Sequence, residues 1–562
     1  MQRYLILLWL GLTAAGIAAP FKLAILFTND EHGELLPYDF IRQKPKPTSL
    51  IHCASLIRQY RADYPLHLLL SAGDTYQGSP LAYYFHYRDS LSVHPMLKAM
   101  NTLGYDAWVP GNHDIEQGLP FLKKIETQAE FDCISANIRY LNHDSLFFKP
   151  YVIKQVGPVK IAILGLTTPA IPLWLTPDLY QGVQFDDMIL TAEKWVDLIR
   201  KRENPDLLIG LFHSGMNQEW DSAYCVQRGI PLANPTLELA RRIPDFDLII
   251  CAHSHKLIND TINEDYRNGG LINKLGKTSF AQARAHGSHL GVCLFHLDST
   301  DKAITIDSIS VKTVSAYGIQ PDSGMLTLFQ QEHRVLQNYV NDSIGNARHE
   351  ISARSARIHD NPLIDLIHSA QLEISGADLS IAAVFNDDQR IPPGKITVAD
   401  LFRLYPYENT MVKTKMSGYQ IKAYLEYNAR FFQTVDSSTR SIQAAQLFNP
   451  DIRSYNFDTI EGLNYILDIT QPLGRRVTSL SYPQGSPVRE SDTLSVVMNS
   501  YRFSGGGGFI AALGVPSLPL VESIPLSVRD MLIDYIRSHP SPAIDCSNNW
   551  KLYPDSIRIL YR

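Results

Sequence analysis

The segment LAILFTNDEHG, residues 23–33, joins a run of apolar residues to an acid and a histidine at the point where the run ends. A continuous apolar run of this length, closed by polar residues and a glycine, is typical of a strand buried on both faces. Asp30 and His32 are two residues apart, and in an extended segment such residues point to the same side. The segment therefore predicts a buried strand that presents two metal-ligand side chains at its end.

The same pattern recurs at four further places before residue 260. In each place an apolar run or a turn ends in residue types that bind metals, often beside a glycine that permits a tight turn. One histidine at a strand end is usually an ordinary polar residue, so the recurrence carries the argument. Mixed imidazole, carboxylate and amide ligands favour zinc, manganese, iron or cobalt over calcium. The four segments are SAGDTYQG with Asp74, PGNHDIEQG with Asn112 and His113, LFHSGM with His213, and CAHSHK with His253 and His255.

Apolar runs and helix-like stretches alternate from residue 21 to about residue 315, which predicts a layered α/β domain. Residues 324–345 show helical spacing of apolar residues and predict a connecting helix. Beyond about residue 350 the pattern predicts a second domain that mixes helices and strands. We expect a signal peptide over 1–19, a metal-bearing domain over 20–322, a linker helix over 323–348 and a second domain over 349–562.

Composition and charge limit the possible partners. Of the 562 residues, 45% are apolar and 19% charged, as in globular proteins. The net charge of −6 argues against a nucleic-acid polymer, which would require a basic face. Residues 1–20, MQRYLILLWLGLTAAGIAAP, have the pattern of a cleaved secretory signal and are too short for a good membrane span. We expect a secreted or periplasmic protein without stable membrane insertion. The six cysteines are widely spaced, and the sequence alone does not pair them.

The ordered motifs D-x-H, GD, GNHD, H and AHSH resemble those of the calcineurin-like metallophosphoesterases. With FTNDEHG followed by a second domain, nearly the whole mature chain resembles the 5′-nucleotidase family of exported nucleotide hydrolases. GDTYQGSPL, YPYENTM and NSYRFSGGGG resemble its branch of bifunctional 2′,3′-cyclic-nucleotide 2′-phosphodiesterases/3′-nucleotidases. The resemblance implies an α/β metallophosphoesterase domain with two sheets flanked by helices, joined by a linker helix to an α+β 5′-nucleotidase C-terminal domain.

The resemblance also implies roles for single residues. Asp74 would bridge two divalent metal ions, and a hydroxide between the metals would attack phosphorus. His113 is expected to stabilise the transition state or to protonate the leaving oxygen. Glu116 stands where the family can carry an aspartate that orients this histidine, and a solvated side chain is the alternative. The implied ligands are Asp30, His32 and His255 for one metal, and Asn112, His213 and His253 for the other.

In this family the second domain supplies an aromatic clamp for the base. In NSYRFSGGGG, residues 499–508, Tyr501 has the aromatic position and is expected to stack on a nucleobase while the glycines let the backbone approach the ribose. Its expected partner is Tyr455 or Phe457, with ordinary packing as the alternative for each. Gly507 stands where 5′-nucleotidases carry an acid, which favours cyclic and 3′ substrates. Weaker candidates for ribose or phosphate contacts are Asn499, Arg502 and Arg390.

The sequence therefore favours an exported phosphoesterase with two divalent metals (zinc, manganese, cobalt or iron) that hydrolyses 2′,3′-cyclic nucleotides and 3′-nucleotides to nucleosides and phosphate. A 5′-nucleotidase or UDP-sugar hydrolase is the alternative among enzymes, with sulfur-ester cleavage as a third possibility. An exported nucleotide-binding protein without turnover is the alternative of another class, and the intact ligand set argues against it. We expect a monomer or weak dimer that takes a small nucleotide.

Overall fold

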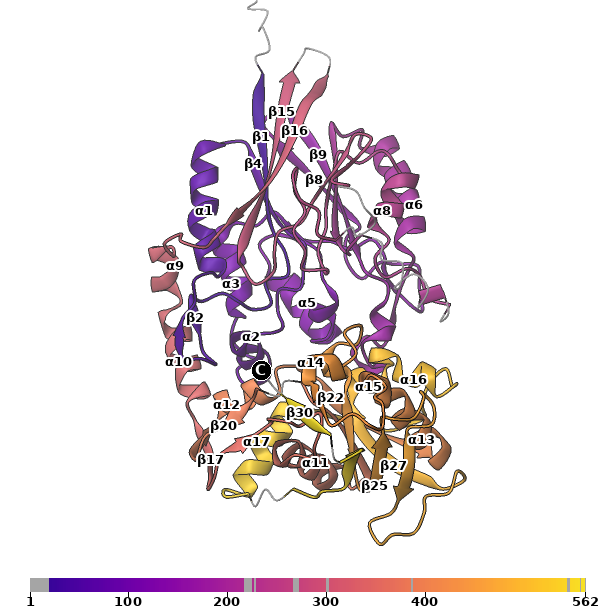
Figure 1. Ribbon diagram of the computed structural model, residues 1–562. Helices are drawn as coiled ribbons and strands as arrows, with labels where there is room; N and C mark the ends of the chain where they lie inside the picture. The colour runs from indigo at the N-terminus through magenta and orange to yellow at the C-terminus, as the bar shows by residue number, and fades with distance from the viewer. Residues whose placement is uncertain are drawn as a thin grey trace, which may run out of the picture.

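The computed structural model describes residues 20–216, 225–226, 229–265, 272–299, 303–385, 388–542, 546–555 and 557–560. The expected signal peptide lies outside the described residues. The chain forms two domains, joined along one side by the helices α9 and α10 (Figure 1). Among the described residues, every helix is too short or too polar to cross a bilayer.

The first domain is built on two six-stranded sheets that pack face to face. Apolar side chains of both sheets, including Ile25, Leu70, Ile163 and Leu211, form one core between them. The strand orders are β16-β15-β1-β4-β5-β6 and β13-β14-β12-β11-β9-β8. The strands are β1 (Phe21–Thr28), β4 (His67–Ser71), β5 (Ala107–Trp108), β6 (Asp132–Cys133), β8 (Tyr151–Val156), β9 (Val159–Thr167), β11 (Leu207–His213), β12 (Leu248–Ile250), β13 (Lys274–Leu275), β14 (Thr278–Ala281), β15 (His289–Ser299) and β16 (Ile304–Ser315).

Helices cover the outer face of each sheet. α1 (Leu50–Asp63) and α3 (Pro95–Leu103) share an apolar core with the first sheet. α6 (Met188–Arg202) and α8 (Thr236–Arg242) share another with the second sheet. The predicted layered α/β domain is confirmed. The helices α2 (Pro80–Tyr87) and α5 (Leu119–Gln128) lie near the edge of it that faces the second domain (Figure 1), and the short helix α4 (Asn112–Ile115) comes between β5 and α5 in the chain.

Parallel strands carry the candidate ligands to that edge. β1 runs parallel to β4 and β4 to β5, while β11 runs parallel to β9 and β12. The carboxyl ends of parallel strands meet at one edge of a sheet, where open α/β sheets bind their ligands. Asp30, Asp74, Asn112, His213 and His253 all lie at or just after the carboxyl ends of these strands.

The linker differs from the single helix expected over 323–348. It forms two helices, α9 (Ser323–Leu328) and α10 (Gln330–Val340), which meet at Phe329. α10 buries Leu336 and Val340 against the core of the first domain. Residues Ser343–Ala347 instead form β17, which pairs with β21 (Gly394–Thr397) of the second domain. The helix prediction is wrong beyond Val340 because these residues pair in a sheet.

The second domain is built on a five-stranded mixed sheet with the order β24-β19-β27-β22-β28. β27 ends, and α15 (Ser500–Phe503) begins, on the side of this domain that faces the first domain (Figure 1). The other elements used below are β19 (Leu379–Ala383), β22 (Thr410–Ser417), β24 (Asp458–Glu461), β25 (Asn464–Asp468), β27 (Thr493–Asn499), β28 (Leu520–Ser527), β29 (Trp550–Tyr553), α11 (Pro362–Ser375), α12 (Val398–Leu404), α13 (Gly418–Asn428) and α17 (Val528–Ser538).

The domains touch beside the segment PGNHDIEQG. Tyr83 of α2 meets the ring of Phe402 edge-on at 5.5 Å, and the Arg529 guanidinium lies over both rings. In the loop after α12, the carboxylate of Glu408 accepts a hydrogen bond of 3.4 Å from Nε2 of Gln117. The second domain therefore reaches the loop that carries His113.

Candidate metal centre

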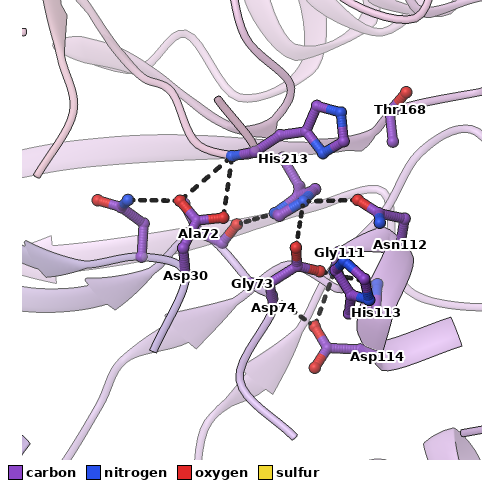
Figure 2. Close-up of polar contacts among 12 residues, drawn as sticks. Asp30, Ala72, Gly73, Asp74, Gly111, Asn112, His113, Asp114, Thr168 and His213 are labelled. Atoms are coloured by element: carbon purple, nitrogen blue, oxygen red, sulfur yellow. Dashed lines mark hydrogen bonds and ion pairs between the residues drawn. The ribbon is translucent and has the colours of Figure 1, made fainter. Parts of the chain in front are cut away.

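The expected ligand side chains converge on Asp74. One group with metal-binding potential contains Asp30, His32, Asp74 and His255, and the other contains Asp74, His213 and His253. In each group the potential donor atoms lie within 4.8 Å of one another. Asp74 belongs to both groups, and Figure 2 shows its carboxylate between His213 and the loop of Asn112 and His113.

The two oxygens of Asp74 have different surroundings. Oδ1 accepts a hydrogen bond of 2.9 Å from the backbone N–H of His113. Oδ2 is buried and accepts no hydrogen bond, although Nε2 of His213 is 3.2 Å away and Nε2 of His32 is 3.9 Å away. A buried carboxylate oxygen without a donor is costly unless a cation satisfies it. The residues present therefore fit a bound metal ion on each side of Asp74.

The side chains of His255 and Asn112 bring further potential metal-ligand atoms to the two groups. Nε2 of His255 lies 3.0 Å from Nε2 of His32 and 3.6 Å from Oδ1 of Asp30. On the other side, Oδ1 of Asn112 lies 3.2 Å from Nε2 of His213, so the amide oxygen joins that group. Each group thus offers two imidazole nitrogens with carboxylate oxygens, and the group of His213 adds an amide oxygen. Such a set suits zinc or a similar transition metal.

Hydrogen bonds behind the ligands orient them. Nδ1 of His213 faces the Ala72 carbonyl at 2.7 Å, and Nδ1 of His32 faces the Gln77 carbonyl at 3.2 Å. These contacts leave Nε2 of each ring for the centre, as is usual for histidines that bind metals. The carboxylate of Asp114 accepts the backbone N–H groups of Gly111, Asp74, Thr75 and Tyr76, and so ties the two ligand loops together.

The backbone at the ligands is strained. Asp30, His32, Asp74, His253 and His255 all have positive φ angles, between 49° and 70°. Residues other than glycine rarely adopt this conformation, and where they do they cluster at functional sites. The shared conformation is an independent sign that these five positions serve a site rather than the stability of the fold.

His113 lies beside the two groups without belonging to either. Its Nδ1 is 2.8 Å from Oε2 of Glu116, and its ring centre is 5.3 Å from that of His32. Burial lowers the pKa of His113, but the charge of Asp74 and the hydrogen bond to Glu116 outweigh it and raise the pKa to about 10. The structure thus places Glu116 against His113 and not in solvent.

Two residues of this centre were not singled out from the sequence. The ring of His286 lies 5.2 Å from that of His32 and 5.7 Å from that of His255. It carries the same signal as the ligands, a histidine beside a glycine soon after a strand, in this case β14. Trp174, whose ring is 5.2 Å from that of His253, follows no such pattern and had no signal in the sequence.

Arg502 is not placed to contact a substrate. Its guanidinium is buried and makes two hydrogen bonds, of 2.7 and 2.8 Å, to the carboxylate of Asp458. It also donates to the carbonyls of Tyr455 and Gly506. Arg502, which was expected to contact the ribose or phosphate, therefore holds together the two segments that carry Tyr455 and Tyr501.

Three other residues that were expected to contact the substrate take part in the protein's own packing or secondary structure. Phe457 is fully buried and packs against Phe431 and Trp550, so neither face of its ring is open to a base. Asn499 caps α15 by accepting the N–H of Arg502 and is 5% exposed. Arg390 is exposed in the short strand β20 (Arg390–Ile391), where it pairs with Ser352.

The glycine run serves the protein's own packing. Gly505, Gly507 and Gly508 have positive φ angles. A Cβ at Gly506 would lie 2.4 Å from the ring of Tyr501, and one at Gly507 would lie 2.6 Å from Arg502 and from Asn456. The protein's own packing thus accounts for these glycines, and the expectation that they let the backbone approach the ribose stays a prediction. Tyr501 and Tyr455 are both partly exposed and remain the open aromatic candidates.

Comparison with known proteins agrees with this architecture. The family model of the calcineurin-like phosphoesterases matches residues 23–257, and that of the 5′-nucleotidase C-terminal domain matches residues 343–514. The chain belongs to the calcineurin-like phosphoesterases that carry a 5′-nucleotidase C-terminal domain, a family of phosphoric ester hydrolases.

Curated relatives match over nearly the whole chain. The trifunctional nucleotide phosphoesterase protein YfkN of Bacillus subtilis is 29% identical over 96% of this chain, which spans 39% of the length of YfkN. A 2′,3′-cyclic-nucleotide 2′-phosphodiesterase/3′-nucleotidase of Yersinia enterocolitica is 28% identical over 96% of this chain and 89% of its own. A Staphylococcus aureus crystal structure described as a 5′-nucleotidase has 24% identity and a TM-score of 0.76, covers 94% of this chain and 99% of its own, and shows the shared fold.

Proposed function

We propose that this protein is an exported phosphoesterase with two divalent metal ions that hydrolyses 2′,3′-cyclic nucleotides and 3′-nucleotides to nucleosides and phosphate. The observation that carries the proposal is the carboxylate of Asp74, shared by two groups of ligand-type side chains and left with one buried oxygen that accepts no hydrogen bond. The relative from Yersinia enterocolitica, whose name states both activities, supports the choice of substrate.

We assign one metal ion to Asp30, His32 and His255 and the other to Asn112, His213 and His253, with Asp74 between them. Zinc, manganese, cobalt or iron would suit these ligands. When bound, such a pair of ions supplies neutralisation of phosphoryl charge and a reactive water near neutral pH. The protein's contribution is to fix the ligands, through the strained backbone and through the Asp114 carboxylate that joins both ligand loops.

His113 is assigned the proton transfer to the leaving oxygen. It stands at the rim of both groups with a side chain that is 38% exposed, so a nucleotide can reach it. Glu116 holds Nδ1 of the ring and favours its protonated form, which leaves Nε2 directed away from Glu116 and able to donate. The backbone N–H of His113 donates a hydrogen bond to Oδ1 of Asp74, which fixes the backbone of His113 relative to the candidate ligands.

The base is assigned to the second domain, between Tyr501 and Tyr455. Both rings are partly exposed, and their loops are held by the same guanidinium of Arg502. Gly507 has no room for an acidic side chain, since its Cβ would meet Arg502 and Asn456 at 2.6 Å. A carboxylate for ribose is therefore missing where a 5′-nucleotidase would have one. A 5′-nucleotidase or UDP-sugar hydrolase remains the alternative, and a binding protein without turnover is the alternative of another class.

A substrate panel tests this proposal. Metal-loaded protein is offered 2′,3′-cyclic AMP, 3′-AMP, 5′-AMP and a UDP-sugar, and released phosphate is measured beside an Asp74→Ala control. We expect release from the first two substrates only. A preference for 5′-AMP or the UDP-sugar would favour the alternative enzyme, and metal binding without release from any substrate would favour the binding protein.

A further inference from the structure

A second group of ligand-type side chains lies in the second domain, away from Asp74. Asp360, just before α11, Asp365 within α11, and Cys546 bring one carboxylate oxygen each, or the thiol, within 4.8 Å of one another. Glu461, at the end of β24, joins them through the hydroxyl of Ser547, which lies 3.0 Å from Oδ2 of Asp360 and 2.8 Å from Oε2 of Glu461. Three carboxyl groups and one thiol thus meet where the chain enters β29.

One carboxylate oxygen of this group has no hydrogen-bond donor. Asp360 accepts the backbone N–H groups of Asn361 and Asn549, and Glu461 accepts that of Gly462. The single hydroxyl proton of Ser547 is shared between Asp360 and Glu461. The side chain of Asp365 is 94% buried, given a relative exposure of 6%. Its Oδ2 accepts the N–H of Ser547, but its Oδ1 is buried and accepts no hydrogen bond. A buried carboxylate oxygen without a donor, beside two further acids, points to a cation.

Positive charge is also missing. Among the described residues, no lysine, arginine or histidine forms an ion pair with Asp360, Asp365 or Glu461. Burial raises the pKa of Asp365 to about 7, and the charges of Asp360 and Glu461 add to this effect. Burial and the charges of Asp360 and Asp365 raise the pKa of the Cys546 thiol. A cation bound among these groups would offset their crowded negative charge.

We propose that Asp360, Asp365 and Cys546 form a zinc site, with Glu461 close by, that fastens the segment before β29 to the start of α11. Zinc is favoured because it accepts thiolate and carboxylate ligands together in a tetrahedral arrangement, whereas calcium and magnesium require oxygen ligands. On binding, the thiol of Cys546 gives its proton to solvent and its sulfur electron pair to the metal. The site is independent of the catalytic centre and of the proposed function.

Thiol labelling of the full-length protein tests the site. Cys546 is the one partly exposed cysteine, and the other five, all within the described chain, are buried. An aromatic disulfide reagent under native conditions should therefore label Cys546, and the Cys546→Ser variant should not react. After treatment with a chelator, zinc should slow labelling at least tenfold, whereas magnesium and calcium should not.

Variants separate this site from the catalytic centre. Asp74→Ala should keep the protection by zinc, and Asp365→Asn should lose it, whereas Asp436→Asn, at an exposed acid of the same domain, should keep it. If Asp365→Asn fails to fold, zinc content decides: Asp74→Ala should hold one more zinc per chain than Asp74→Ala with Cys546→Ser. Labelling of the unaltered protein at the same rate with and without zinc, or equal zinc content in these two variants, would overturn the proposal.

Discussion

Nδ1 of His113, in the short helix α4, lies 2.8 Å from Oε2 of Glu116, the residue that follows this helix. The contact places a carboxylate behind the histidine at the rim of the metal centre. Replacing His113 by Asn should lower kcat about 10²- to 10⁴-fold, the usual contribution of an acid that protonates a leaving group. The measurement is kcat for 3′-AMP at saturating metal, and a loss below threefold would contradict the role.

Glu116→Gln should lower kcat less than His113→Asn does, and it should shift the pH profile of kcat. Glu116 raises the pKa of His113 by charge and by hydrogen bonding, so its removal lowers that pKa. An acid with a lower pKa loses its proton at lower pH, and the basic limb of the kcat profile should therefore move to lower pH. A uniform loss of kcat with an unmoved limb would mean that Glu116 does not act through His113.

Tyr501→Ala should weaken binding of the base. Stacking of a base on an aromatic ring contributes about 1–3 kcal/mol, so KM for 2′,3′-cyclic AMP should rise about fivefold to a hundredfold. KM for a small phosphodiester without a base should change little. Phe457→Leu is the matched control, because its ring is buried and should not affect this ratio. Equal effects of Tyr501→Ala on both substrates would refute stacking.

The buried ion pair of Arg502 with Asp458 should matter most for stability. Asp458→Asn leaves the guanidinium buried without its counter-charge, which costs about 3–5 kcal/mol in comparable pairs. Arg537→Ala, which breaks the exposed pair with Asp342, should cost less than about 1 kcal/mol. Urea unfolding of both variants provides the comparison, and similar costs would show that the buried pair contributes no more than the exposed one.

Because Glu408 is buried, we predict that the free energy of unfolding depends on pH. Burial raises its pKa from the ordinary 4.5 to about 7, with Arg529 opposing and Glu116 adding to the shift. The folded protein holds this proton more tightly than the unfolded chain, so the resulting stability is present below about pH 4.5 and is lost as pH rises through about 7. The free energy of unfolding should fall across this range by about 1.4 kcal/mol for each unit of pKa shift.

Glu408→Gln should remove most of that slope. The exposed Glu522→Gln provides the control and should leave the slope unchanged. Unfolding by urea at pH 5, 6, 7 and 8 gives the four free energies needed. The same slope in both variants would show that Glu408 is not the titrating group.

The convergence of the candidate ligand residues could be predicted from the sequence because their signal is local. Each follows an apolar run, and parallel strands bring the ends of such runs to one edge. The surroundings of Arg502 and Phe457 could not be predicted in this way. Burial of a cation or a phenyl ring depends on partners far along the chain, here Asp458 for Arg502 and Trp550 for Phe457.

The same limit applies between the domains. Glu408 looks like an ordinary loop acid in YPYENTM, and its burial follows only from the approach of Gln117, 291 residues away in sequence. The helix expected up to residue 348 ended at Val340 for a similar reason, since β21 supplies a strand partner that the local pattern does not contain. Patterns within a segment thus predicted the elements and the side chains that gather around Asp74, whereas contacts between segments needed the structure.

A time course on 2′,3′-cyclic AMP tests the central claim most directly. If one centre built on Asp74 performs both steps, metal-loaded protein should first produce 3′-AMP and then adenosine with an equal amount of phosphate. Asp74→Ala should abolish both steps together. The account would be contradicted if Asp74→Ala lost one step and kept the other. It would also be contradicted if the unaltered protein left 2′,3′-cyclic AMP intact while it hydrolysed 5′-AMP.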